Sequence, residues 1–372
     1  MKKTDRSDGL NRSDGSDRSI QQKIEKIWKK IQRKERISQK DGLALYYNAD
    51  LLTLGRMAEK IRFEKHSDRI VTFVVDRNIN YTNICVSGCR FCAFFAAPKS
   101  KKGYVISRES LKQKIQETLD LGGTQILLQG GMNPDLDFDY YIDLLKFIKD
   151  NFDIHIHGFS PPEINFIAEK SSLSIEETIK RLKDAGLGSI PGGGAEILCD
   201  DIRQKVSPNK CMTEPWLEVM RQAHKLGMRS SATMMFGHVE TPAHIFEHLG
   251  RIRDLQDETN GFTAFIPWTF QPDNTRLKVR KAHAAEYLRV LALSRIFLAN
   301  IDNIQASWVT QGDKIGQTAL FFGANDIGST MIEENVVSSA GVDFMMTEQQ
   351  LKRLITEAGF EPKQRDCFYN FL

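Results

Sequence analysis

Short apolar runs alternate with helical segments along most of this 372-residue chain, and this alternation most constrains its fold. The first run, Ile70–Val75, continues through a polar stretch into a loop that contains three cysteines. Later runs include Gln125–Gln129, Ile154–Phe159 and Arg229–Phe236, and apolar residues at helical spacing follow each of them. About seven or eight such units favour a parallel sheet, closed into an α/β barrel of the (β/α)8 TIM type. An open doubly wound sheet is the alternative.

The residues before the first strand differ from this repeating region. Residues 1–19 are charged, poor in apolar side chains and partly repetitive, which predicts a disordered tail. Residues 20–69 are expected to form an N-terminal helical extension, with one helix over residues 41–63. We expect the extension to lie on the barrel, because its first helix has too small an apolar face for membrane binding. The barrel, with a C-terminal helix, is predicted over residues 70–372.

Charge is distributed unevenly. Residues 1–40 hold 13 Lys/Arg and 6 Asp/Glu, so they carry +7, and the remaining chain carries −4 of the total of +3. The main body therefore lacks the basic character of nucleic-acid-binding domains, and no nucleic-acid substrate is expected. No apolar run approaches the roughly 20 residues that span a bilayer, so no integral membrane segment is predicted. The polar N-terminus and the cysteine usage favour a cytoplasmic protein.

The most specific chemical motif is the cysteine loop, with thiols at Cys85, Cys89 and Cys92. This spacing, Cys-x3-Cys-x2-Cys, suits one iron–sulfur cluster, because soft sulfur ligands bind iron and short loops let the side chains converge. Three ligands on a four-iron cluster leave one iron open for chemistry. A structural zinc site is disfavoured, because zinc takes four ligands and no fourth Cys or His lies near in sequence.

This cysteine spacing, with Phe91 before the last cysteine, resembles the signature of the radical S-adenosylmethionine (SAM) enzymes. The resemblance implies a [4Fe-4S] cluster on the three cysteines, SAM on its open iron, and reduced flavodoxin or ferredoxin as electron donor. Two further stretches resemble superfamily motifs, one for the SAM amino group and one whose backbone frames the adenine. With an acidic residue suited to ribose hydroxyls, the implied SAM-binding residues are Gln129, Gly130, Gly131, Glu196, Phe236, Gly237 and Glu240.

Polar side chains also follow the predicted strands, at the end where barrel enzymes carry function. His155 and His157 fall on one face of their strand, and His157 lies nearer its C-terminal end. Ordinary hydrogen-bonded core histidines are the alternative interpretation for both. Later loops mix aromatic, amide and hydroxyl groups, which suits a ligand with an aromatic ring and a sugar. The candidate substrate-binding residues are His157, Ser160, Trp268, Gln271, Ser307 and Gln311.

Several segments narrow the resemblance to the cyclic dehypoxanthinyl futalosine synthases (dehypoxanthine futalosine cyclases) of the futalosine route to menaquinone. Ile190–Leu198, Pro267–Pro272 and Gln305–Gly312 are among those that carry it. The aminofutalosine synthases and the radical enzymes that build the deazaflavin chromophore share much of it and are the alternatives. Phe94–Ala97 departs from the pattern, because relatives often have Phe-Tyr-Arg there. That change removes a phenol and a charge near the cluster, so no substrate contact is assigned there.

The resemblance also implies a reaction. A 5'-deoxyadenosyl radical abstracts the C4' hydrogen of dehypoxanthine futalosine, the carbon radical adds to the benzoate ring, and loss of one electron and one proton restores aromaticity. A base must take the ring proton. His157, Glu196 and His238 are candidates, and the sequence does not choose among them. A non-catalytic iron–sulfur module is a further alternative, but it would need no glycine-rich strand ends.

Overall fold

The computed structural model describes residues 11–342 and 344–372, and its elements alternate between strand and helix as the sequence predicted. The strands are β1 (Ile70–Val74), β2 (Asp76–Asn80), β3 (Gln125–Gln129), β4 (His155–Gly158), β5 (Ser189–Ile190), β6 (Arg229–Phe236), β7 (Phe262–Thr269), β8 (Asn303–Ile304), β9 (Asp326–Ser329) and β10 (Glu361–Gln364). The helices are α1 (Asn11–Gln32), α2 (Gln39–Asn48), α3 (Leu51–Lys65), α4 (Arg108–Asp120), α5 (Phe138–Asn151), α6 (Pro161–Ser171), α7 (Ile175–Asp184), α8 (Asp200–Val206), α9 (Thr213–Lys225), α10 (Pro242–Thr259), α11 (Ala284–Phe297), α12 (Trp308–Gln311), α13 (Asp313–Ala319), α14 (Asn335–Ser338) and α15 (Glu348–Glu357).

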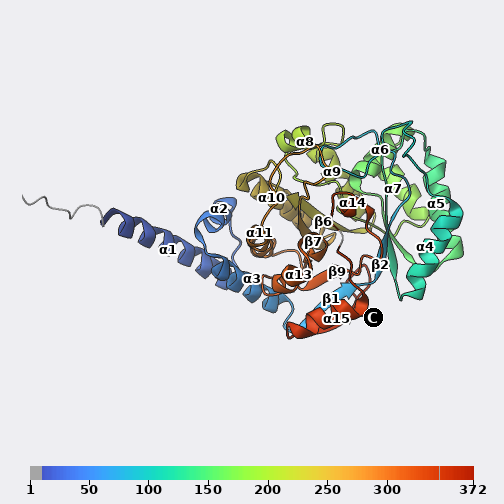
Figure 1. Cartoon of the computed structure of the whole chain (residues 1–372). Coiled ribbons are helices and arrows are strands. Elements are labelled where there is room, and N and C mark those ends of the chain that lie inside the picture. Colours follow the sequence, from blue (N-terminus) through green and yellow to red (C-terminus); the bar gives the residue numbers. More distant parts are fainter. Residues whose placement is uncertain (1–10, 343) are drawn as a thin grey trace, which may run out of the picture.

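The strands form a parallel barrel. One sheet has the order β2-β3-β4-β5-β6-β7-β8, and a second has the order β10-β1-β9. The sheets join where Gln305, just after β8, bridges in parallel to Asp326 of β9. The segment 330–333 then hydrogen-bonds along β2, through the N–H groups of Ile332 and Asn78 at 3.3 Å each. Since β1 and β2 are separated by one residue, they act as one bent strand, and the predicted (β/α)8 barrel is confirmed (Figure 1).

The first apolar run leads through the polar stretch into the cysteine loop, as predicted, but the polar stretch is itself a strand. The apolar part, β1, lies between β9 and β10. The polar part, β2, pairs with β3 and ends at the loop. The physical reason is that β2 faces the inside of the barrel, where Asp76 and Asn78 line a cavity. Its polar residues therefore reflect a lumen and not a loop.

The N-terminal helices differ from expectation at two places. Residues 11–19 were predicted as part of a disordered tail, but they form the first turns of α1. Residues 1–10 of that predicted tail lie outside the described residues. Once an amphipathic segment has nucleated a helix, each added residue gains a hydrogen bond. The single helix expected over residues 41–63 is two helices, because Asp50 caps α3 by accepting the N–H of Thr53 at 2.9 Å.

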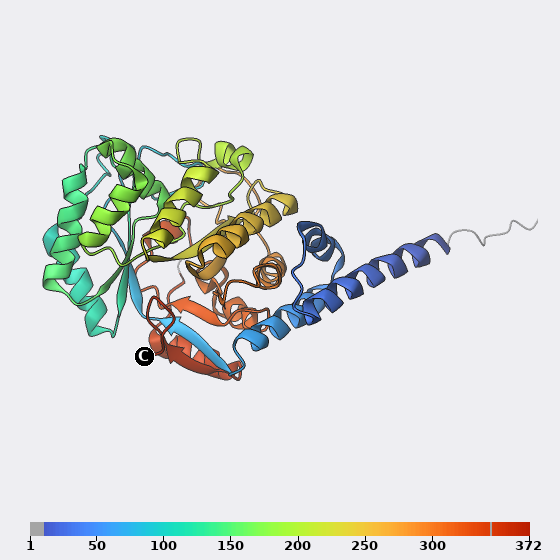
Figure 2. The same cartoon turned by 180° about the vertical axis from the view of Figure 1, so that it is seen from behind.

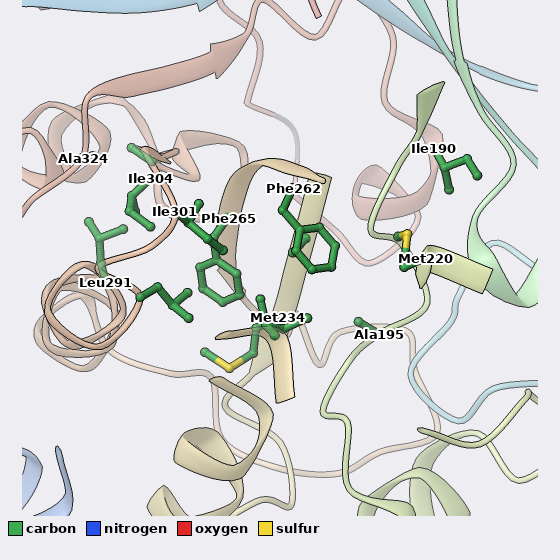
Figure 3. Packing of buried hydrophobic residues seen from close by; sticks show 14 of the residues in the cluster. Ile190, Ala195, Met220, Met234, Phe262, Phe265, Leu291, Ile301, Ile304 and Ala324 are labelled. Atoms are coloured by element: carbon green, nitrogen blue, oxygen red, sulfur yellow. The ribbon is translucent and has the colours of Figure 1, made fainter. Parts of the chain in front are cut away.

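Helices cover the outside of the barrel. Helix α3 packs against α11, and α2 packs against α10 and α11. The expectation that the first helix lies on the barrel was wrong, because α1 packs against α2 and extends away from the barrel (Figure 2). Figure 3 shows the packing beneath these helices, with Phe265 of β7 beside Met234 of β6 and Leu291 of α11. Each of these side chains is fully buried, and burial of such a side chain stabilises the fold by about 1.5–3 kcal/mol. No helix in the two described ranges is long and apolar enough to cross a membrane.

Candidate active site

A cavity of about 290 Å³ lies inside the barrel. Its wall takes residues from β2, β3, β4, β6 and β7, from the loops that follow the strands, and from the C-terminal segment after β10. Four residues that the sequence analysis proposed for SAM or substrate line it: Gln129, His157, Trp268 and Ser307. They come from distant parts of the chain, so the barrel does bring these predicted residues to one cavity.

His157 borders this cavity as a neutral hydrogen-bonding group. Its Nδ1 lies 2.7 Å from the hydroxyl of Ser189, and its Nε2 lies 3.4 Å from the hydroxyl of Ser231. Burial lowers the pKa of His157 to about 3. His155, on the same face of β4 as predicted, also contacts the Ser189 hydroxyl at 2.7 Å. The pair is therefore uncharged near neutral pH, and only His157 lies on the cavity wall.

Two carboxylates that the sequence analysis did not single out also line the cavity. Asp76 accepts hydrogen bonds from the amide of Gln125 at 2.8 Å and from the Ser329 hydroxyl. Glu334 accepts from the amide of Asn78 at 2.7 Å and from two backbone N–H groups at the start of α14. Burial raises the pKa of both carboxyl groups. The available signal was the alternation of polar residues along β2, which places one polar face toward the lumen.

Glu196, one of the predicted candidate bases, lies outside the cavity wall in a buried ionic cluster. Its Oε1 pairs with the Lys210 ammonium at 2.8 Å, and Lys210 in turn lies 5.1 Å from the ring centre of Phe91 in the cysteine loop. Its Oε2 is buried, has no hydrogen-bond partner among the residues that the structure describes, and lies 3.7 Å from Arg203. A buried acceptor without a donor fits a ligand hydroxyl, as the predicted role toward the SAM ribose requires.

His238, the third candidate base, is also outside the cavity wall. Its Nδ1 accepts the N–H of Val239 at 2.8 Å, and its Nε2 lies 3.1 Å from the carbonyl oxygen of Met235. Burial lowers its pKa. His238 belongs to the loop after β6, and of the three predicted bases only His157 borders the cavity.

The predicted SAM-binding residues after β6 form a tight turn. Glu240 accepts the N–H groups of Gly237 at 2.5 Å and His238 at 2.9 Å, and Phe236 is buried in the core. A positive φ of 85° at position 237 explains why glycine stands there. The carboxylate therefore stabilises the backbone of this motif.

The glycines after β3 bring this strand close to the cysteine loop. A Cβ on Gly131 would lie 2.2 Å from the carbonyl oxygen of Ile84, and a Cβ on Gly130 would lie 2.6 Å from the ring of Tyr81. The N–H of Gly130 donates to the buried carboxylate of Glu163 at 2.9 Å. Packing against the cysteine loop thus demands glycine here, whatever ligand the strand end contacts.

Three predicted substrate residues form hydrogen bonds within the loops around the cavity. Gln271 and Gln311 both donate to the hydroxyl of Thr269, at 3.0 and 2.5 Å, and Ser160 donates to Glu163 at 2.5 Å. None of the three lines the cavity. They hold the loops after β7, β8 and β4, so their geometry favours a positioning role over substrate contact.

The three thiols of the cysteine loop are near enough to one another to interact electrostatically, Cys89 with Cys92 and Cys92 with Cys85. Two backbone N–H groups, from Ser87 and Met132, approach the sulfur of Cys85 at 3.4 Å each, and the Ser87 hydroxyl lies 2.9 Å from the sulfur of Cys89. Burial raises the pKa of Cys89 to about 11. Within residues 11–342 and 344–372, no three Cys, His, Asp or Glu side chains converge tightly enough to hold one metal ion. The three thiols are also one ligand short of a structural zinc site, whereas they suit a cluster that offers a separate iron to each thiolate.

Comparison with known proteins agrees with this geometry. Residues 79–252 match the radical SAM superfamily, and residues 259–372 match the CofH/MqnC C-terminal region. The chain is 48% identical to a cyclic dehypoxanthine futalosine synthase of Halalkalibacterium halodurans, over 94% of this chain and 95% of that protein. It is 45% identical to a protein of the same name from Streptomyces coelicolor, over 91% of this chain and 86% of that protein.

Other relatives have different activities in their names. A 5-amino-6-(D-ribitylamino)uracil–L-tyrosine 4-hydroxyphenyl transferase of Methanocaldococcus jannaschii is 43% identical, over 91% of this chain and 98% of that protein. Among solved structures, the FeFe-hydrogenase maturase HydG from Carboxydothermus hydrogenoformans superposes with a TM-score of 0.74 at 17% identity, covering 96% of this chain and 82% of that one. Methylornithine synthase (PylB) gives 0.69 at 16% identity, covering 90% and 97%. The two structures support the fold alone.

Proposed function

This chain belongs to the radical SAM family that includes the cyclic dehypoxanthine futalosine synthases, and we propose that it cyclises dehypoxanthine futalosine to cyclic dehypoxanthinyl futalosine in menaquinone biosynthesis. The likeness to two synthases over most of their length carries this proposal. A lumen with aromatic, hydroxyl and amide groups supports it, because the substrate joins a benzoate ring to a sugar.

When bound, the [4Fe-4S] cluster and SAM supply a 5'-deoxyadenosyl radical that removes the C4' hydrogen. Cys85, Cys89 and Cys92 would hold the cluster, and the free Oε2 of Glu196 would accept a hydroxyl of the SAM ribose. Reduced flavodoxin or ferredoxin would deliver the electron, in the cytoplasm, where thiols stay reduced.

The protein's own task is to hold C4' and the benzoate ring together in a cavity without bulk water. Orientation of this kind can supply an effective molarity on the order of 10⁵ M or more. Trp268 and Ser307, on the cavity wall, would orient the ring and the sugar. His157 would take the ring proton, since it is neutral and borders the cavity, with Asp76 and Glu334 as the alternatives within the same wall.

Mass analysis after anaerobic reconstitution tests the proposal. With SAM, dithionite and dehypoxanthine futalosine, we expect 5'-deoxyadenosine and a product that lacks two hydrogen atoms of the substrate. The second candidate is the transferase reaction, favoured by the archaeal relatives at only slightly lower identity. Parallel incubations with L-tyrosine plus 5-amino-6-(D-ribitylamino)uracil, and with 3-[(1-carboxyvinyl)oxy]benzoate, distinguish the alternatives. Consumption of either of these, with dehypoxanthine futalosine left intact, would overturn the proposal.

A further inference from the structure

A basic surface lies on the loop that holds the three cysteines. Residues 83–104 contain no acidic residue and carry four cations, Arg90, Lys99, Lys101 and Lys102. All four side chains are exposed to solvent. The cluster ligands and these cations thus share one short stretch of chain.

A second basic segment packs directly against this loop. Residues 274–282 also lack acidic residues and carry four exposed cations, Arg276, Lys278, Arg280 and Lys281. The N–H of Arg276 donates to the carbonyl oxygen of Arg90 at 2.9 Å. Its guanidinium donates to the carbonyl oxygens of residues 88 and 89 and lies 5.3 Å from the ring centre of Phe95. The two segments therefore form one surface, here called the basic surface.

The charge of the basic surface is largely uncompensated. Of its eight cations, Arg280 alone has a carboxylate within 4.0 Å among the described residues, from Glu286 at 3.1 Å. Carbonyl groups, and not acids, receive the guanidinium of Arg276. The chain after residue 40 carries a net charge of −4, so this concentration of positive charge is local. Its field would attract an acidic partner over a distance near the Debye length, about 8–10 Å at ordinary ionic strength.

Exposed apolar side chains lie within the same surface. Val86, between the first two cysteines, is 38% exposed, and Tyr104, at the end of the loop, is 37% exposed. Apolar contacts surrounded by charge are typical of transient protein interfaces, which charge steers and apolar contact stabilises. A phosphate backbone would use the cations but not these side chains. The composition therefore favours a protein partner over a nucleic acid.

We propose that the basic surface, residues 83–104 with 274–282, docks an acidic one-electron donor protein of the flavodoxin or ferredoxin type. The inference rests on the proposed function, because that reaction needs an electron at the cluster. One electron passes from the reduced partner to the cluster, and the partner leaves oxidised by that electron, with no bond made or broken. Docking on the loop that holds the ligands keeps the path short, and charge steering raises the association rate.

Charge reversal on the loop tests the proposal. The variant is Lys99→Glu/Lys101→Glu/Lys102→Glu, in the full-length reconstituted protein. Formation of 5'-deoxyadenosine is measured twice, once with dithionite and once with increasing reduced flavodoxin. We expect the dithionite rate to stay at the wild-type value. We expect the KM for flavodoxin to rise on the order of tenfold or more, with a weaker dependence on salt.

The matched control reverses the same number of charges elsewhere. Lys112, Lys146 and Lys180 are exposed lysines on α4, α5 and α7, outside the basic surface. Their triple replacement by Glu should leave both rates unchanged. A binding titration of oxidised flavodoxin, followed by flavin fluorescence, needs no turnover. The affinity of flavodoxin should be weaker for the loop variant and unchanged for the control variant.

The outcomes distinguish failure of the docking surface from failure of the proposed function. Equal flavodoxin KM and affinity in the loop variant, the control and the wild type would overturn the docking surface. Tighter binding of a DNA duplex than of flavodoxin to the wild type, lost in the loop variant, would also overturn it and indicate a nucleic-acid site. Absence of dithionite-driven turnover in the wild type would count against the proposed function, while the binding titration would still decide the docking surface.

Discussion

A buried histidine should make the stability of this protein depend on pH. His248 of α10 has no exposed surface, and its Nδ1 accepts the N–H of Leu198 at 3.0 Å. Burial lowers its pKa to about 3, from an ordinary value near 6.5. The folded pKa is depressed, so the unfolded chain alone takes up a proton as the pH falls below about 6.5. Stability is therefore full above that pH and is lost progressively below it.

The magnitude follows from proton linkage. Between about pH 7.5 and about pH 5, this one group should remove about 2 kcal/mol from the free energy of unfolding. The substitution His248→Asn keeps an acceptor for the N–H of Leu198 and cannot titrate. Urea unfolding of the variant should therefore show a loss over this pH range that is smaller by about 2 kcal/mol than the loss in the wild type.

A control separates the titration from a general loss of stability. Ser294→Ala removes a buried hydroxyl of α11 that donates to the carbonyl oxygen of Val290 at 2.8 Å. It should lower stability at every pH by about 0.5–1.5 kcal/mol and leave the slope with pH unchanged. If His248→Asn kept the wild-type slope, the argument from burial would be refuted.

Three further predictions concern the cluster, the buried ion pair between Asp326 and Arg365, and the cavity. Cys89→Ala should abolish iron incorporation, because the cluster loses a ligand; normal iron content by absorption and metal analysis would contradict the cysteine assignment. Asp326→Asn should destabilise the fold by about 3–5 kcal/mol in urea unfolding, because it weakens a buried pair in which Arg365 donates at 2.5 and 3.0 Å. The double change Asp326→Leu/Arg365→Met should recover part of this loss, because it leaves no buried charge without a partner. If the double variant were no more stable than Asp326→Asn, the unpaired charge of Arg365 would not be the cause of the loss. Trp268→Ala should raise the KM for dehypoxanthine futalosine at unchanged iron content, and an unchanged KM would place the substrate elsewhere.

Local signals in the sequence were reliable. The sequence Thr347-Glu348-Gln349-Gln350 has the pattern of a capping box, and the structure shows both of its bonds, from Gln350 N–H to the Thr347 hydroxyl at 3.2 Å and from Thr347 N–H to the Gln350 side chain at 2.8 Å. Ser174 caps α7 by accepting the N–H of Glu177 at 3.1 Å. The cysteine spacing and the alternation of strand and helix were equally readable. Such features depend on residues a few positions apart, and short-range hydrogen bonds and periodicity decide them.

The residues that line the cavity and surround the cluster could not be predicted from the sequence in the same way. The sequence analysis found that Phe94–Ala97 lacks a charge that relatives carry near the cluster. The structure places the guanidinium of Arg276 over Phe95, so a residue from a distant segment restores a positive charge there.

What the sequence by itself determined is therefore the barrel class, the thiol motif and the family. What only the tertiary structure decided is which side chains share a wall. Asp76, Glu334 and Arg365 reach the cavity together because barrel closure and the returning C-terminal segment bring distant residues into contact. Of the predicted bases, His157 alone joins them. The physical reason is that helix caps and strand periodicity arise between neighbours in the chain, whereas the inside of a barrel is formed by residues that meet only after it has closed.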